Sequence, residues 1–420
     1  MSMKTYAMMV LGCKVNDYEA TYIREKMNQY FEETDFKNKA DIYLIFTCCV
    51  TNTAESKTRK FFHEARRRNP EAYIVAVGCL SQIKGDTDDF KDIDLIVGSD
   101  KKDQILDMIL EHESGYKVNK EISSDFEELY IEKYPTKSRS FLKIEDGCNQ
   151  FCSYCIIPYS RGRERSADHN IIIKEAKELS RTNKEIVLTG IHTGRYNDGE
   201  YNLYQLLCEL LKIDGLETIR LSSIEITEIS DEIIELMKDN DKLAPHLHIP
   251  VQSCSNEILK AMNRPYTIKE YKDRICYIRN KLPKVSVSTD LIVGFPGEDD
   301  ELFNETVNNI NEIGFSFIHC FPYSRKNGTR ADKMNNHVDP KIKKERVKKI
   351  LELDHDLRKN FADQFMGENV RVLVERVKDG YSYGYSRNYF YVKVKGEYEI
   401  GSLIDVRITD NKDEVMGICC

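Results

Sequence analysis

Short apolar runs alternate with longer stretches of mixed polarity along the first third of the chain. The runs have the length of buried strands, and the stretches between them have the length of helices. Strands that alternate with helices form a parallel sheet covered on both faces, with its functional groups in the loops after the strands. We predict strands over residues 6–11, 41–46, 73–77 and 93–97, and helices over residues 17–31, 54–68 and 103–113.

A second alternation begins at Ser140, after a polar and charged segment over residues 115–136. We interpret that segment as a linker or a covering segment. The apolar runs that follow are again separated by helical stretches, which predicts a partial (βα) barrel. The expected strands cover residues 141–144, 185–188, 218–221, 247–251, 285–293 and 315–321.

The last part of the chain has a third pattern. A charged helix is predicted over residues 339–360, and apolar and polar positions alternate after Gly367 as in half-buried strands. We place strands over residues 370–377, 389–394 and 404–408, which predicts a small antiparallel β-barrel. The expected fold class is therefore α/β with a C-terminal β-barrel, in domains of residues 1–125, 136–364 and 366–420.

The chain length agrees with several domains, because 420 residues are too many for one hydrophobic core. Hydrophobic residues make up 41% and charged residues 31%, which is typical of a globular protein rather than a disordered one. Every apolar run is shorter than the roughly 18 to 20 residues of a membrane span, and the N-terminus has no signal-peptide pattern. We expect a cytoplasmic protein with no membrane partner.

The net charge of −8 by itself disfavours a nucleic-acid partner, because phosphate binding needs Lys and Arg. Binding depends on local patches, however, and two basic groups lie beside cysteine motifs. The first group is either a phosphate-contact surface or a solvated helix face, and the second either contacts substrate or holds its loop. The first comprises Lys57, Arg59, Lys60, Arg66, Arg67 and Arg68, and the second comprises Arg161, Arg163 and Arg165.

Thirteen cysteines indicate metal or catalytic thiolates in a long intracellular chain. Cys148, Cys152 and Cys155 form a C-x3-C-x2-C motif on one predicted loop. Three thiolates can hold three irons of a 4Fe–4S cluster and leave the fourth iron open, whereas a zinc site normally has a fourth Cys or His nearby. The motif therefore favours an iron–sulfur cluster over zinc or over three cysteines without a metal.

Three further cysteine sites follow predicted strands of the first domain. They are Cys13, the pair Cys48 and Cys49, and Cys79. Parallel strands end at one edge of a sheet, so the fold can bring these thiols together. From spacing alone, they are either the ligands of a second cluster or buried small hydrophobic residues.

The motif at residues 148–155, with Tyr154 before its last cysteine, resembles the signature of the radical S-adenosylmethionine (SAM) superfamily. The resemblance implies that the open iron binds SAM and that a 5′-deoxyadenosyl radical is formed. It also implies SAM contacts from residues at the ends of the barrel strands. The candidates are Tyr154, Thr189, Gly190, Ser222, Ser223, Glu225, Gln252, Asp290 and Ile292.

The segments GCKVN at 12–16, TCCVT at 47–51 and GCLSQ at 78–82 resemble the N-terminal cluster domain of methylthiotransferases. The family pattern makes Cys48, rather than Cys49, the ligand beside Cys13 and Cys79. Phe46 replaces the usual Asn of that pattern, which leaves Cys49 as a competing ligand. The resemblance implies two 4Fe–4S clusters, with SAM as radical source and methyl donor, and a C-terminal TRAM domain.

Within this family, segments such as TGIHTGRY at 189–196 and HLHIPVQS at 246–253 resemble the branch that acts on N6-threonylcarbamoyladenosine. The implied reaction is 2-methylthiolation of that adenosine at position 37 of tRNA, by a monomer that needs an unidentified electron donor and sulfur source. Two family alternatives are isopentenyl-adenosine in tRNA and an aspartate of a ribosomal protein. An alternative of another class is a non-catalytic RNA-binding protein with structural zinc.

Overall fold

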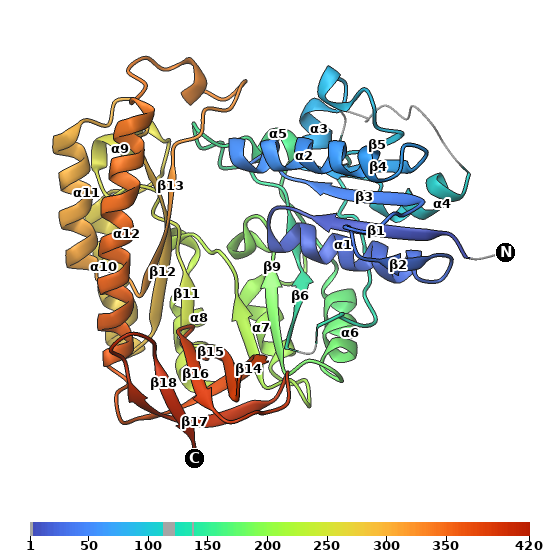
Figure 1. Cartoon of the computed structure of the whole chain (residues 1–420). Coiled ribbons are helices and arrows are strands. Elements are labelled where there is room, and N and C mark those ends of the chain that lie inside the picture. Colours follow the sequence, from blue (N-terminus) through green and yellow to red (C-terminus); the bar gives the residue numbers. More distant parts are fainter. Residues whose placement is uncertain (1–2, 112–121, 137) are drawn as a thin grey trace.

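Five parallel strands form the N-terminal sheet, in the order β2-β1-β3-β4-β5 (Figure 1). The computed structural model describes residues 3–111, 122–136 and 138–420. The sheet confirms the predicted parallel α/β unit. Its strands are β1 (Thr5–Val10), β2 (Glu32–Thr34), β3 (Ile42–Thr47), β4 (Tyr73–Gly78) and β5 (Leu95–Val97), and its helices are α1 (Lys14–Met27), α2 (Asn52–Arg68), α3 (Cys79–Lys84) and α4 (Ile105–Leu110).

Both faces of this sheet are buried, which explains the continuous apolar run of β3. Leu44 and Phe46 pack with residues of α1 and α4, whereas Tyr43 and Ile45 pack with residues of α2 and α3. Helix α1 begins at Lys14, directly after Cys13, and so earlier than the predicted residue 17. The first turn of this helix is mostly polar, so the start of the helix was not evident from the sequence. Only the later turns pack against the apolar face of the sheet. Residues 112 and 113 of the predicted helix 103–113 lie outside the described residues.

Six parallel strands form the central unit in two sheets, β6-β9-β10 and β11-β12-β13, that a bridge between Ser223 and His248 joins. No pairing joins β6 to β13 in the part of the chain that the structure describes, so the predicted partial barrel is confirmed. Its strands are β6 (Arg139–Lys143), β9 (Glu185–Thr189), β10 (Thr218–Leu221), β11 (His246–His248), β12 (Ser286–Val293) and β13 (Phe317–Pro322).

Helices cover the outer face of this barrel, and their apolar sides share one core with the strands (Figure 1). Between β6 and the first of these helices, a strand pair and a short helix frame the cysteine loop. The pair is β7 (Glu145–Asp146) and β8 (Arg165–Ser166), and the short helix is α5 (Ile157–Arg161). The covering helices are α6 (His169–Leu179), α7 (Leu203–Leu210), α8 (Asp231–Asp239), α9 (Asn256–Ala261), α10 (Ile268–Lys281), α11 (Asp300–Ile313) and α12 (Pro340–Asp363).

The C-terminal unit is a closed five-stranded barrel, in the order β14-β15-β16-β18-β17. It docks at the N-terminal ends of the central strands, where Tyr389 stacks on His246 with ring centroids 4.5 Å apart. The sequence predicted three of its five strands, because the tyrosines and glycine of β15 and the short β18 gave no clear apolar pattern. The strands are β14 (Asn369–Lys378), β15 (Tyr381–Ser386), β16 (Tyr391–Lys395), β17 (Leu403–Asp410) and β18 (Met416–Cys419).

None of the helices in the described ranges is both long and apolar enough to cross a membrane.

The buried carboxyl group of Glu175 connects the N-terminal and central units. Glu175 on α6 lies at hydrogen-bond distance from the Tyr18 hydroxyl of α1, 2.9 Å away, and this hydroxyl also donates to the Leu129 carbonyl oxygen. Burial raises the pKa of Glu175 to about 8. Between the ordinary carboxyl pKa and pH 8 the folded protein therefore holds a proton that the unfolded chain releases. Stability from this proton is lost as the pH rises, at no more than about 1.4 kcal/mol per pH unit.

We expect Glu175→Gln, which imitates the protonated carboxyl, to remove part of the loss of stability between pH 6 and 8.5. The unfolding midpoint by circular dichroism, measured anaerobically, checks this. The control is Glu178→Gln on the same helix, whose partner is Arg181 near the surface. Parallel loss of stability in the wild type and Glu175→Gln would show that Glu175 titrates normally.

Candidate functional site

The loop that carries Cys148, Cys152 and Cys155 lies at the C-terminal edge of the barrel, between β7 and α5. Backbone hydrogen bonds fix it: the Cys148 N–H donates to the Gly162 carbonyl oxygen at 3.1 Å, and the Cys155 N–H donates to that of Cys152 at 3.0 Å. Gly147 has a φ of +84°, and a Cβ there would lie 2.0 Å from the Arg163 carbonyl oxygen. Only glycine fits at that position. The backbone at the start of the loop can therefore pack closely against Arg163, which helps to fix the loop that carries the three thiols.

Two charged side chains contact this loop, one from the loop after β9 and one from the loop between α9 and α10. Arg264 donates from Nη1 to Cys152 Sγ at 3.5 Å and forms an ion pair with Glu225. His192 Nδ1 lies 3.8 Å from Cys148 Sγ, and its Nε2 lies 2.8 Å from Glu228. Burial alone would lower the pKa of His192, but the contacts with Cys148 and Glu228 raise it to about 11. The loop thiols therefore have cationic neighbours, which stabilise thiolates.

A cavity of about 170 Å³ lies beside this loop. Four of the nine residues predicted to contact SAM line it, and its other walls include Val50, which follows the Cys48–Cys49 pair. In β12, Asp290 accepts the Gln252 N–H at 2.9 Å through its backbone carbonyl oxygen. The predicted residues that line the cavity are Tyr154, Gln252, Asp290 and Ile292.

The other five predicted SAM contacts lie at the ends of β9 and β10 and do not line this cavity. At Gly190 a Cβ would lie 2.8 Å from Oε2 of Glu145, and Glu225 is paired with Arg264. The Ser222 hydroxyl is buried without a hydrogen-bond partner among the described residues. That hydroxyl is free to bind a polar ligand, whereas Gly190 and Glu225 lie against protein groups. The five are Thr189, Gly190, Ser222, Ser223 and Glu225.

The second group of cysteines gathers at the C-terminal edge of the N-terminal sheet. Cys13 caps α1, Cys48 follows β3, and Cys79 begins α3. A Cβ at Gly12 would lie 3.4 Å from Cys48 Sγ, which brings the first two loops into contact. Burial raises the pKa of Cys48 to about 12, and the charges of Cys79 and Cys13 add to the rise. These three thiols are therefore neighbours.

Cys49 lies on the apolar side of this group. Only 1% of its surface is exposed, and it belongs to the core cluster that includes Phe62 and Leu80. Its hydrogen bond to Cys79, together with the guanidinium of Arg161, holds the pKa of Cys79 at about 6 against the effect of burial. Cys79 is thus the thiol of this group that is held most readily as a thiolate.

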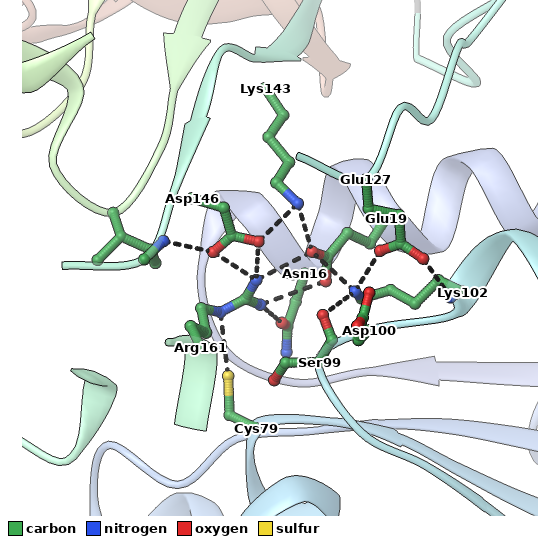
Figure 2. A network of polar contacts seen from close by, with 12 residues as sticks. Asn16, Glu19, Cys79, Ser99, Asp100, Lys102, Glu127, Lys143, Asp146 and Arg161 are labelled. Atoms are coloured by element: carbon green, nitrogen blue, oxygen red, sulfur yellow. Dashed lines mark hydrogen bonds and ion pairs between the residues drawn. The ribbon is translucent and has the colours of Figure 1, made fainter. Parts of the chain in front are cut away.

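Buried ion pairs join the two cysteine groups (Figure 2). Arg161, at the end of α5, donates from Nε to Cys79 Sγ at 3.2 Å and from Nη1 to Glu19 and Asp146 at 2.9 and 3.1 Å. Lys143 lies 2.9 Å from Glu19 and 2.8 Å from Asp146. From the sequence, Arg161 was one of three arginines after the cysteine loop, and no motif indicated a role for Glu19 or Asp146.

The structure decides between the two interpretations of that arginine group. Arg161 and Arg165 are buried and hold the loop, since Arg165 donates from Nη1 to the Arg161 carbonyl oxygen. Arg163 is exposed and its guanidinium lies 4.6 Å from the Phe151 ring centroid. Of the group, Arg163 alone remains available to a substrate.

The basic group on α2 is also partly used within the fold. Arg66 pairs with Asp94 at 2.8 Å and donates to the Ala72 carbonyl oxygen, and Arg68 pairs with Glu64. These two arginines are therefore engaged within the fold, and the phosphate-contact interpretation of the group stays a prediction. Lys57 and Arg67 are exposed and have no ion pair with any described residue, and they stay candidates for RNA contact.

The donor sets suit iron–sulfur clusters. Each group presents three thiols on loops at a sheet edge, and soft thiolates are the ligands that such clusters take. A mononuclear ion has another candidate set in Cys148, Glu164 and His192, whose ligand atoms lie within 4.8 Å of one another. That set uses only one of the six thiols, whereas two clusters account for all of them. The residues present therefore fit two clusters with three protein ligands each.

Comparisons with known proteins agree with this geometry. The Radical SAM superfamily matches residues 142–310, and a family described as Uncharacterized protein family UPF0004 matches residues 5–98. A solved structure of the cobalamin-dependent S-adenosylmethionine radical enzyme OxsB shares the fold, with a TM-score of 0.52 and 12% identity. The alignment covers 83% of this chain and 56% of that chain. Fold and cysteine loop together define a radical SAM enzyme.

Relatives similar over almost the whole chain define the family more narrowly. Threonylcarbamoyladenosine tRNA methylthiotransferase MtaB of Bacillus subtilis is 40% identical over 97% of this chain and 94% of its own length. The protein of the same name from Aquifex aeolicus is 38% identical over 95% and 98%. A tRNA-2-methylthio-N(6)-dimethylallyladenosine synthase of Thermodesulfovibrio yellowstonii is 32% identical over 94% of each chain. The chain belongs to the radical SAM tRNA methylthiotransferase family, whose cofactors are SAM and two 4Fe–4S clusters.

Proposed function

We propose that this enzyme converts N6-threonylcarbamoyladenosine at position 37 of tRNA to its 2-methylthio derivative. The observation that carries the proposal is the full-length similarity to relatives named for that nucleoside, of which the first is 40% identical. The similarity to a dimethylallyladenosine synthase is lower, at 32%, and makes that nucleoside the second candidate. This reaction needs the substrate adenosine of tRNA, an electron donor and a sulfur source. We also propose that the enzyme acts as a monomer.

We assign Cys148, Cys152 and Cys155 to the cluster that binds SAM, and Cys13, Cys48 and Cys79 to the auxiliary cluster. A 4Fe–4S cluster held by the first three would, with SAM, supply a carbon radical that takes the hydrogen atom of the C–H bond, and a cluster held by the other three would supply a binding site for sulfur. The product would carry C–S–CH3 in place of C–H, with the methyl group from a second SAM. We place the first domain at residues 1–125, the radical SAM domain at 136–364 and the TRAM domain at 366–420.

The chain's own residues bind and orient the reactants. Tyr154, Gln252, Asp290 and Ile292 line the cavity beside the loop, which supports SAM binding there. Asp290 also lies 3.3 Å from His248, so its carboxylate has a fixed direction. The remaining candidates, from Thr189 to Glu225, approach the same loop from the adjacent strand ends. Val50 and Thr51 line the cavity from the N-terminal domain, so both cysteine-bearing domains contribute to it.

The proposal is tested by mass spectrometry of tRNA nucleosides from a strain that lacks this gene. We expect the 2-methylthio derivative of threonylcarbamoyladenosine to be absent, with its unmethylthiolated precursor accumulating in its place. The wild-type gene should restore the product, and a Cys148→Ala gene should not.

Two outcomes would redirect the assignment. Loss of 2-methylthio-dimethylallyladenosine, with the threonylcarbamoyl product intact, would support the second candidate. If both tRNA nucleosides persist and a ribosomal protein loses a methylthio group from an aspartate, the substrate is a protein.

A further inference from the structure

We propose that Arg161 is a positioning residue that fixes the auxiliary cluster against the SAM-binding loop and raises the reduction potential of that cluster. The inference rests on the ligand assignments of the proposed function but not on which adenosine is the substrate. It concerns one guanidinium that contacts, directly or through one side chain, every loop assigned to the auxiliary cluster.

The direct contact is with Cys79. Arg161 ends the short helix that follows Cys155, and its Nε donates to Cys79 Sγ at 3.2 Å. Its Nη1 donates to Asp146, two positions before Cys148 in the chain. The same side chain therefore holds a thiol of one group and the backbone entry to the loop of the other (Figure 2).

The remaining two loops are reached through Asn16. Arg161 donates from Nη2 to Asn16 Oδ1 at 2.7 Å. Asn16 in turn donates from Nδ2 to the carbonyl oxygens of Leu11 and Thr47, at 2.6 and 3.0 Å. Thr47 directly precedes Cys48 in the chain, and Leu11 is separated from Cys13 by a single glycine. The guanidinium of Arg161 thus holds the thiol of Cys79 directly. Through Asn16 it also holds the backbone beside Cys13 and Cys48.

Arg161 belongs to a buried network of ion pairs and is its point of contact with sulfur. Glu19 lies within 3.5 Å of Lys102, Lys143 and Arg161, and Asp146 within the same distance of Lys143, Arg161 and Arg165. Lys102 has Glu127 as a second partner. The lysines and arginines of this network therefore share carboxylates with one another, and the guanidinium of the set that touches a cysteine is that of Arg161.

Hydrogen bonds and positive charge at cluster sulfurs favour the more negative, reduced state. Arginine is suited to this task because its planar fork donates in several fixed directions at once, whereas lysine is a point charge on a flexible stem. Arg161→Lys keeps the buried charge but cannot reach Cys79, Asn16, Glu19 and Asp146 together. The structure also offers a matched control: Arg165 is buried, pairs with Asp146, and makes no contact with a cysteine.

The test is a redox titration of the anaerobically reconstituted full-length enzyme, followed by electron paramagnetic resonance of each cluster. We expect Arg161→Lys to shift the midpoint potential of the auxiliary cluster to more negative values and to leave that of the SAM-binding cluster unchanged. Arg165→Lys should leave the potential of the auxiliary cluster unchanged. Equal shifts in the two variants, or no shift in Arg161→Lys, would overturn the inference.

A second variant keeps the test decisive if Arg161→Lys does not retain its auxiliary cluster. Asn16→Ser preserves Arg161 but removes the link to the Cys13 and Cys48 loops. We expect it to lose iron from the auxiliary cluster only, and full retention of both clusters would contradict the proposed link. If the wild-type enzyme itself binds a single cluster, the ligand assignment fails and the role of Arg161 falls with it; two clusters with unshifted potentials in Arg161→Lys overturn the role alone.

Discussion

Replacement of Cys148, Cys152 or Cys155 by alanine is expected to reduce methylthiolation to background and to remove about four irons per chain. The three thiols lie on one loop whose backbone is fixed at Gly147 and at both ends, and no other cysteine is on that loop. A cluster that lost one of its three ligands would have no replacement thiol. The measurements are iron and acid-labile sulfide per chain, together with the nucleoside mass spectrum.

Cys254→Ala is the control for these variants. Cys254 is fully buried in the core of the same domain, and its thiol belongs to the apolar cluster rather than to the loop. We expect it to keep about eight irons per chain and most of its activity. A loop variant that kept the same iron content as Cys254→Ala would contradict the assignment of the loop to a cluster.

Cys48→Ala and Cys49→Ala are expected to differ sharply although the two residues are adjacent. Cys48 lies against Gly12 and beside the loop of Cys13, whereas Cys49 is enclosed by the apolar side chains of α2 and α3. We expect Cys48→Ala to lose the irons of the auxiliary cluster and all methylthiolation. Cys49→Ala should keep both clusters and lose about 1 to 2 kcal/mol of folding stability, because it leaves a small void in the core.

Iron content and the spectrum of the auxiliary cluster distinguish the two variants. The SAM-binding cluster serves as an internal reference, because neither residue is among the three cysteines assigned to it. Loss of the auxiliary cluster in Cys49→Ala, with retention in Cys48→Ala, would make Cys49 the ligand.

The fold was predictable where local pattern and burial coincide. The run Ile42–Thr47 is apolar because both of its faces are covered, and this continuous burial made the parallel sheet evident from the sequence. Prediction failed where the pattern is set by other constraints. In β15 burial alternates, but the buried positions are the small Ser382, Gly384 and Ser386 and the tyrosines lie between them, so the strand has no apolar pattern; β18 is short, and both strands were missed.

The site divides in the same way. Cys148, Cys152 and Cys155 are near one another in the chain, so their chemistry was evident from their spacing. Cys13 and Cys79 are far apart, and the sequence placed them together only through the rule that parallel strands end at one edge. The roles of Arg264 and His192 beside the loop were not predicted, because a lone Arg or His gives no signal of which thiol it will face.

The sequence by itself determined the three structural units, the six thiols proposed as cluster ligands and the family to which the enzyme belongs. These features are written in short motifs and in the burial of single strands, which are local properties of the chain. Only the tertiary structure decided that Arg161 would contact Cys79 and that Glu19 would face Asp146 across two domains. Such contacts join residues more than 80 positions apart, and the buried charges are stable only because the fold brings every partner to one place.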